Sequence, residues 1–145
     1  MMKDVWISIS NRQSNGQEEE DTLVFNTAGR YSYMDGVGVL SYQESELTGL
    51  EGTRTSVTVM PDQVVVDRAG MLTGQIVFRE GAREAFPYHT PYGQMILGVN
   101  TRKIRDNFNE NGGDLEIDYI TNLAHTYVAK NKFRISVKEM ENANG

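Results

Sequence analysis

The residues best suited to chemistry in this sequence are two glutamates, Glu44 and Glu46, in the stretch YQESELTGLEGT. They stand two positions apart in a segment that reads as a β-strand, so their side chains share one face. Two neighbouring carboxylates in a protein interior can serve as general acid and base in a hydrolase, or they can hold a ligand. On an outer face they would only be solvated. Their use therefore depends on which face of the strand is buried.

The elements that position these glutamates are strands. Apolar and polar residues alternate with a period of two along almost the whole chain, and helical periodicity is nearly absent. Tight turns such as Asp35-Gly36 and Pro61-Asp62 separate most of the segments. The predicted strands are Val5 to Asn11, Thr22 to Met34, Val37 to Leu47, Thr53 to Met60, Gln63 to Ala69, Leu72 to Arg79, Arg83 to Thr90, Gln94 to Arg105, Asp114 to Leu123, and Tyr127 to Lys138.

A meander of ten strands buries its one apolar face best by closing on itself. We therefore expect residues 1–145 to form a single all-β domain, an up-and-down antiparallel β-barrel. A two-sheet sandwich is the alternative, and it usually needs longer crossing connections than most of those found here.

The register of the last hairpin separates an apolar face from a charged one. If the loop is Ala124-His125-Thr126, residues whose numbers sum to 250 lie opposite each other. Tyr119 then faces Asn131 on the apolar side, and Glu116 faces Arg134 on the outer side, where opposite charges favour the pairing.

The Asp35-Gly36 turn suits a type I′ hairpin. The register that follows pairs aromatic rings with strand glycines, a device that stabilises curved sheets. Its inward pairs are Tyr33 with Gly38, Tyr31 with Leu40, Gly29 with Tyr42, Thr27 with Glu44, and Phe25 with Glu46. This register places both glutamates in the interior.

The next two hairpins add an arginine to the inward face. The Pro61-Asp62 turn pairs Val59 with Val64, Val57 with Val66, and Thr55 with Arg68. A loop centred on Gly81 pairs Ile76 with Phe86 and Gly74 with Tyr88. The inward polar residues are then Tyr42, Glu44, Glu46, Thr55, Arg68, Tyr119 and Asn131.

This polar cluster has several possible uses. It can be a buried structural network, in which Arg68 offsets one glutamate. It can anchor a small ligand, with Tyr42 and Thr55 as neutral hydrogen-bonding groups, because ten strands leave room for a cavity. It can also be the site of a hydrolase-type enzyme that uses the two glutamates. Alternatively, the chain acts as an interaction protein through its outer surface around Met34, Val37 and Val39.

The amino-acid composition limits the classes of molecule that the protein is expected to bind. Fourteen Lys and Arg against twenty Asp and Glu give a net charge of -6, so no nucleic acid is expected. The chain has no cysteine, which excludes disulfides and thiolate zinc sites, and its two histidines lack ligand spacing, so no metal or cofactor is expected. MMKDVWISIS does not resemble a signal peptide, and no apolar run approaches about 20 residues. We expect a cytoplasmic protein without a membrane partner, monomeric or homodimeric.

Several blocks carry a resemblance to a known family: YQESELTGLEGTRTSV, RAGMLTGQIVFREG, TPYGQMILGVNTRKI, GGDLEIDYI and KNKFRISVKE. From about Lys3 to Glu139 the chain resembles the YwiB-like bacterial proteins, defined by the domain of unknown function 1934. Members resemble calycins, the barrel group that includes lipocalins and intracellular fatty-acid-binding proteins. The resemblance implies a calycin-like barrel and no established activity.

Overall fold

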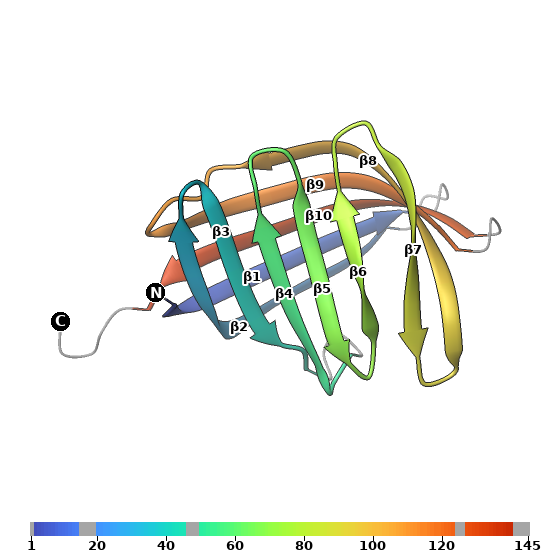
Figure 1. The fold of residues 1–145 in the computed structure, drawn as a ribbon, viewed down its shortest axis with the longest axis horizontal. Coiled ribbons are helices and arrows are strands. Elements are labelled where there is room, and N and C mark those ends of the chain that lie inside the picture. The colour runs from blue at the N-terminus through green and yellow to red at the C-terminus, as the bar shows by residue number, and fades with distance from the viewer. Residues whose placement is uncertain (1, 15–19, 46–49, 124–126, 141–145) are drawn as a thin grey trace.

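The computed structural model describes residues 2–14, 20–45, 50–123 and 127–140. These residues form ten antiparallel strands that close into one barrel, each strand beside its neighbours in sequence, with β1 next to β10 (Figure 1). The strands are β1 (Lys3–Ser14), β2 (Glu20–Met34), β3 (Val37–Gln43), β4 (Thr53–Val59), β5 (Val64–Gly70), β6 (Thr73–Phe78), β7 (Arg83–Thr90), β8 (Gly93–Asp106), β9 (Gly112–Leu123) and β10 (Tyr127–Glu139). The predicted all-β, up-and-down barrel is confirmed.

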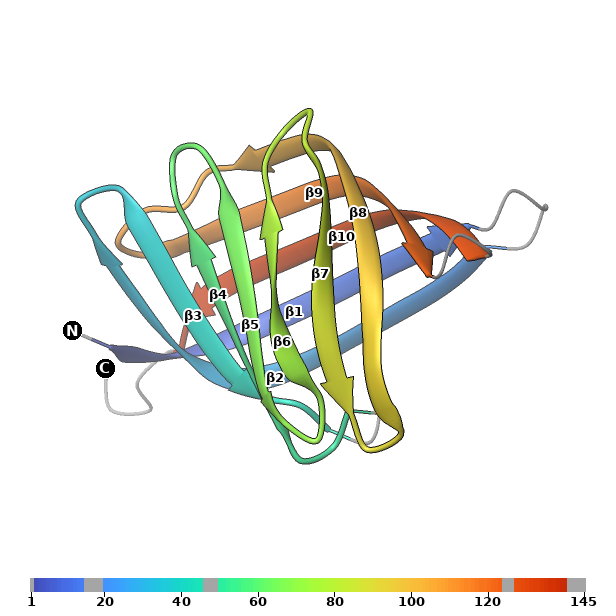
Figure 2. The ribbon, with the colours of Figure 1, turned by 45° about the vertical axis from the view of Figure 1, so that its right-hand side comes forward.

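The barrel is built from strands of two lengths. The short strands β3 to β6 cross steeply in front of the long strands β1, β9 and β10 (Figures 1 and 2). The described part of the chain contains no helix with the length and apolarity of a membrane span.

One end of the barrel, which we call the plugged end, is filled by aromatic side chains. It carries the turns at 35–36 and 61–62 and the segment 107–111 between β8 and β9. Phe108 is buried against Tyr31, with the ring centroids 5.8 Å apart. The Tyr31 hydroxyl donates to the carbonyl oxygen of Asn109 at 2.6 Å. These contacts fix the connecting segment across the end of the core.

The opposite end, which we call the open end, is where β1, β3, β5, β7 and β9 finish. The open end includes the connections 71–72 and 91–92. The core between the two ends is aliphatic, with residues such as Ile7, Leu40, Leu115 and Ile135 fully buried.

The registers predicted from the turns are confirmed in most positions. The last hairpin pairs Tyr119 with Asn131 and Glu116 with Arg134. The Asp35-Gly36 hairpin, in which Asp35 has φ 53° and Gly36 φ 80°, pairs Tyr33 with Gly38 and Gly29 with Tyr42. The Pro61-Asp62 hairpin pairs Thr55 with Arg68. The loop Ala124-His125-Thr126, from which the sum of 250 was deduced, lies outside the described residues.

The prediction for the end of the third strand is wrong. β3 ends at Gln43, and β2 pairs with β3 only as far as Gly29, so Thr27 and Glu44 are not ladder partners. Beyond Gly29, β2 continues along β1, where Thr27 pairs with Ile7. The Glu44 amide instead donates to the carbonyl of Thr53 at 2.8 Å, so the chain turns towards β4. Glu46, and with it the pair Phe25 with Glu46, lies outside the described residues.

The seam between β6 and β7 also departs from the prediction. Gly74 pairs with Tyr88 as expected, but the ladder contains only this pair and Thr73 with His89, so Ile76 and Phe86 are not partners. Pro87 has no amide hydrogen to offer a continuing ladder. Near the β6–β7 turn, the Gly81 amide donates instead to the carbonyl of Thr101 on β8 at 2.9 Å.

Candidate functional site

A single row of inward-facing positions crosses the short strands near the open end. Consecutive ladders pair Tyr42 with Thr55, Thr55 with Arg68, Arg68 with Gly74, and Gly74 with Tyr88. Because directly opposite side chains on one sheet face are neighbours, this row brings residues from five strands together. Gly74 has no side chain, which leaves the space between Arg68 and Tyr88 open for them to meet.

Glu44 lies at the β3 end of this row and is buried, with 5% of its surface exposed. Its Oε1 accepts a hydrogen bond from the Thr55 hydroxyl at 2.7 Å. Burial and the neighbouring Glu44 carboxylate raise the pKa of Tyr42 well above its ordinary value, so its phenol stays protonated and can donate to Glu44. The carboxylate is therefore held by hydroxyl groups from β3 and β4.

Arg68 occupies the centre of the row. Its Nη1 donates to the Tyr88 hydroxyl at 3.0 Å. Among the described residues, no carboxylate forms an ion pair with Arg68, and its Nε is buried without a hydrogen-bond partner. Glu44 acts on Arg68 through its charge. Arg68, predicted to offset one glutamate, is thus bonded to a tyrosine and keeps its Nε donor without a partner among the described residues.

The other two predicted site residues lie across the interior on β9 and β10. Tyr119 packs edge-on against Phe78 with ring centroids 4.8 Å apart, and burial raises the pKa of its phenol to about 12. Asn131 is buried, and its Nδ2 donates to the Thr121 hydroxyl at 3.1 Å and to the Ala129 carbonyl at 3.3 Å. The predicted cluster is therefore split into hydroxyl-bound Glu44, the Arg68–Tyr88 pair, and these two residues.

Towards the open end, side chains that face inward keep part of their surface exposed. Val99 on β8 is buried, whereas Leu97 and Met95, which lie on the same face of that strand nearer to the open end, are partly exposed. Six large side chains that pack against the core and are partly exposed, which we call the mouth residues, are Leu72, Phe86, Met95, Leu97, Tyr119 and Phe133, of which Phe86 and Phe133 lie farther from the open end along their strands than the buried Tyr88 and Asn131. Arg68, at the base of this set, is also partly exposed. These side chains therefore keep part of their apolar surface accessible to solvent.

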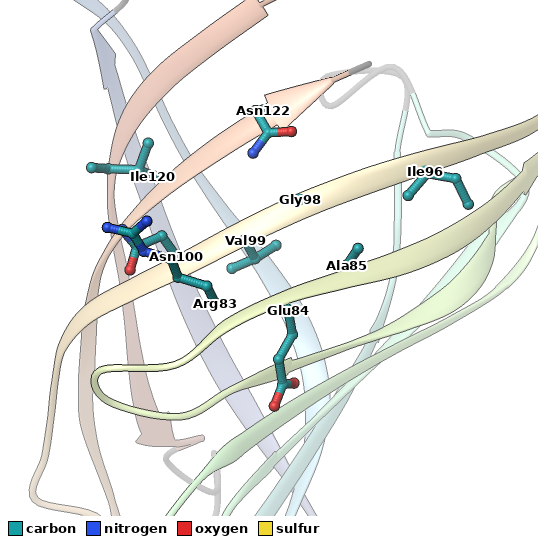
Figure 3. Close-up of a pocket in the computed structure, with 9 residues that line it drawn as sticks. All are labelled: Arg83, Glu84, Ala85, Ile96, Gly98, Val99, Asn100, Ile120 and Asn122. Carbon is teal, nitrogen blue, oxygen red and sulfur yellow. The ribbon is translucent and has the colours of Figure 1, made fainter. Parts of the chain in front are cut away.

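A separate groove of about 480 Å³ lies on the outer face of β7, β8 and β9 (Figure 3). Its outward rows pair Arg83 with Asn100 and Gly98 with Asn122. The Asn122 amide lies over Gly98, where a Cβ would stand 2.5 Å from its Nδ2 (Figure 3). Ile96, 52% exposed, forms one apolar wall. This groove contains none of the predicted site residues.

Tyr88 is the site residue that sequence reasoning missed. Its predicted pairing with Gly74 is confirmed, but Tyr88 is not among the inward polar residues predicted from the sequence. The missing signal was the β5–β6 register, which pairs Arg68 with Gly74 and so brings the guanidinium to the tyrosine. Both flanking hairpins were predicted, but without a register for the β5–β6 hairpin they could not be joined to find the contact.

The described residues show neither a metal site nor a complete hydrolase site. Within the described residues, no three His, Asp or Glu side chains gather as metal ligands would. The paired-glutamate hydrolase stays a prediction, because only Glu44 of the pair is among the described residues, and its carboxylate is engaged by Thr55.

The family is decided by comparison with known sequences. Residues 7–135 match the family described as "Domain of unknown function (DUF1934)". The chain belongs to this family. It is 28% identical over 100 residues to the "Uncharacterized beta-barrel protein YwiB" of Bacillus subtilis (strain 168), covering 69% of each chain. The crystal structure of the ywiB protein from Bacillus subtilis superposes with a TM-score of 0.86 and 21% identity, covering 97% of this chain and 94% of that one. At this identity the likeness concerns the DUF1934 barrel fold alone.

Proposed function

We propose that this DUF1934 protein binds a small molecule in the open end of its barrel, in the manner of calycins. The observation that carries the proposal is the incomplete burial of the mouth residues, whose side chains face inward. An apolar pocket with a few convergent polar groups is the usual form of a ligand site. In this proposal the mouth residues contact the apolar part of the ligand, and Arg68, Tyr119 and Asn131 contact its polar part.

The other predicted site residues take a supporting role in the proposal. Glu44 is held by Thr55, and Tyr42 lies beside it, so these three residues form a hydrogen-bonded wall behind Arg68. Glu46 is proposed as a ligand contact from its spacing in the sequence. We place the activity in the cytoplasm, which cell fractionation with an antibody to the native protein would check.

The test compares two neighbouring positions on β8. Leu97 faces the mouth and Ile96 faces outward, so Leu97→Trp fills the proposed pocket and Ile96→Trp is its matched control. A larger side chain introduced into a core that is already filled lowers the free energy of unfolding by about 1–3 kcal/mol. We expect Leu97→Trp to melt close to the wild type and to lose binding of an apolar fluorescent dye, while Ile96→Trp keeps it. A strongly destabilised Leu97→Trp variant would mean that the mouth is already filled.

Mass spectrometry of molecules extracted from native protein would identify the ligand directly. The same extraction from the Leu97→Trp variant is the control, because a bound molecule should be depleted from it and a contaminant should not. Equal recovery of a molecule from both variants would count against the barrel interior as its binding site.

A second candidate function is interaction with another protein chain through the outer surface. The exposed Ile96 beside the groove on β7 to β9 favours it, as does Met34, which is 66% exposed on β2. Light scattering with Ile96→Asp and Met34→Asp distinguishes the cases. A homodimer that dissociates in one variant supports this function, and a protein that is monomeric throughout argues against self-association.

A further inference from the structure

Arg68 is a half-buried cation whose Nε is buried without a hydrogen-bond partner among the described residues. A guanidinium has five N–H donors in a fixed planar fork. Tyr88 accepts a hydrogen bond from Nη1, and Nε is enclosed without an acceptor among the described residues. A buried donor without a partner is costly, so a native site of this kind calls for an acceptor that is supplied from outside the chain.

The neighbours of Arg68 supply few acceptors. Tyr88 and Tyr119 are kept protonated by burial, which raises the pKa of each phenol. The Glu44 carboxylate accepts from Thr55 and forms no ion pair with Arg68 within the described chain. Among the described residues, the Glu44 carboxylate therefore acts on the positive charge of Arg68 without an ion pair.

We propose that the ligand of this barrel is a small amphipathic acid, whose anionic group binds the Arg68 fork and whose apolar body lies along the mouth residues. This inference rests on the proposed function and names the chemical class of the ligand.

The geometry fits a carboxylate best. Its two oxygens match the parallel N–H groups of an arginine, which gives a bidentate, charge-assisted contact. The Tyr88 hydroxyl, which accepts from Nη1, has its own proton free to donate to a carboxylate oxygen placed beside the fork. The mouth residues then receive an aliphatic or aromatic body, which contributes affinity through burial of apolar surface.

The experiment compares two probes that have alkyl chains of the same length and differ in the charge of their head groups. Calorimetry measures binding of dodecanoate and of dodecanol to the native protein, with octanoate and octanol as a shorter pair. We expect the carboxylate to bind roughly tenfold to a hundredfold more tightly than the alcohol, the range for a hydrogen-bonded charged contact. Arg68→Met should remove that preference and leave the alcohol affinity unchanged.

Two further variants control for folding and for charge. Arg54→Met removes an exposed arginine from β4 and should leave the preference intact. Arg68→Lys keeps the charge without the fork and should retain only part of the preference, which matters if Arg68→Met fails to fold. Equal affinity for acid and alcohol in the native protein would overturn the inference and leave the proposed function standing. Absence of binding by all four probes, together with retention of the apolar dye in Leu97→Trp, would overturn both.

Discussion

Substitution of Gly74 by alanine tests the central row of the barrel. A Cβ at this position would lie 1.7 Å from Cδ1 and 2.1 Å from Cε1 of Tyr88, whereas ordinary contact begins at 3.4 Å. The tyrosine ring must therefore retreat by about 1.5–2 Å, which stretches its 3.0 Å hydrogen bond from Arg68 beyond the usual limit. The substitution should disconnect Arg68 from its one hydrogen-bonding partner among the described side chains.

The expected cost follows from two opposing terms. Loss of a hydrogen bond to a charged group costs about 1.5–3 kcal/mol. The smaller entropy of the unfolded alanine chain offsets about 0.4–1 kcal/mol of that, since Gly74 has no left-handed backbone angle that alanine would resist. We expect the free energy of unfolding to fall by about 1–2 kcal/mol, as measured by urea denaturation with an unchanged m-value.

Gly38 on β3 provides a matched control. A Cβ there would lie 3.4 Å from the Tyr31 hydroxyl oxygen and 3.6 Å from Cδ2 of Tyr33, which is ordinary contact. Gly38→Ala should therefore leave stability unchanged or raise it by about 0.4–1 kcal/mol. If Gly74→Ala is as stable as Gly38→Ala, Tyr88 does not lie over Gly74 and the row is wrongly assigned.

Three other substitutions probe the interior. Thr55→Val should lower the free energy of unfolding by about 1–3 kcal/mol, because the buried Glu44 loses a hydrogen-bond donor. Thr58→Val, on the outer face of the same strand, is the control and should change stability little. Equal effects of the two substitutions in denaturation would contradict this prediction. Tyr31→Phe should cost about 0.5–1.5 kcal/mol through its lost hydrogen bond at the plugged end, and a melting temperature equal to the wild type would count against that contact. The pKa of Tyr119, raised to about 12 by burial, predicts stability that is complete below pH 10 and falls as the pH rises towards 12, by up to about 1.4 kcal/mol per pH unit. Denaturation at pH 9 to 11.5 should show a shallower fall for Tyr119→Phe, and an identical slope would refute the assignment.

The fold and most registers were predictable because local signals agreed with the face pattern. In the last hairpin, one register alone separates Ile117 and Phe133 from Asp118 and Lys132, and the structure adopts it. The outer charges pair diagonally, with Lys132 3.3 Å from Glu116, a detail that depends on side-chain reach and not on register. The separation of an apolar from a charged face therefore sufficed to predict the pairing of these two strands.

The error at Glu44 arose where a strand loses one of its two partners. At Gly29 the ladder of β2 to β3 ends while its ladder to β1 continues, and a Cβ there would meet Ile7 Cδ1 at 2.4 Å and the Ser41 carbonyl oxygen at 2.5 Å. The ring of Tyr42, which was expected to cover this glycine, is not among its nearest contacts. A hairpin register carries no information on where the ladder ends, because that depends on the curvature of the closed barrel.

The two ends of the barrel differ in how fully their interior polar groups are hydrogen-bonded. At the plugged end the Tyr31 hydroxyl has an acceptor, whereas the Nε of Arg68 has none among the described residues. Removing an arginine from a satisfied buried network is strongly destabilising, whereas replacing a poorly paired buried charge by an apolar residue of similar size is often neutral or stabilising. With its Nε unpartnered, Arg68 belongs to the second class, so Arg68→Met should melt at or above the wild-type temperature. A residue whose removal stabilises the fold is retained for another reason, and binding of an acid is the reason that its free donors support. A lowered melting temperature with unchanged carboxylate preference would instead assign Arg68 to the structural network.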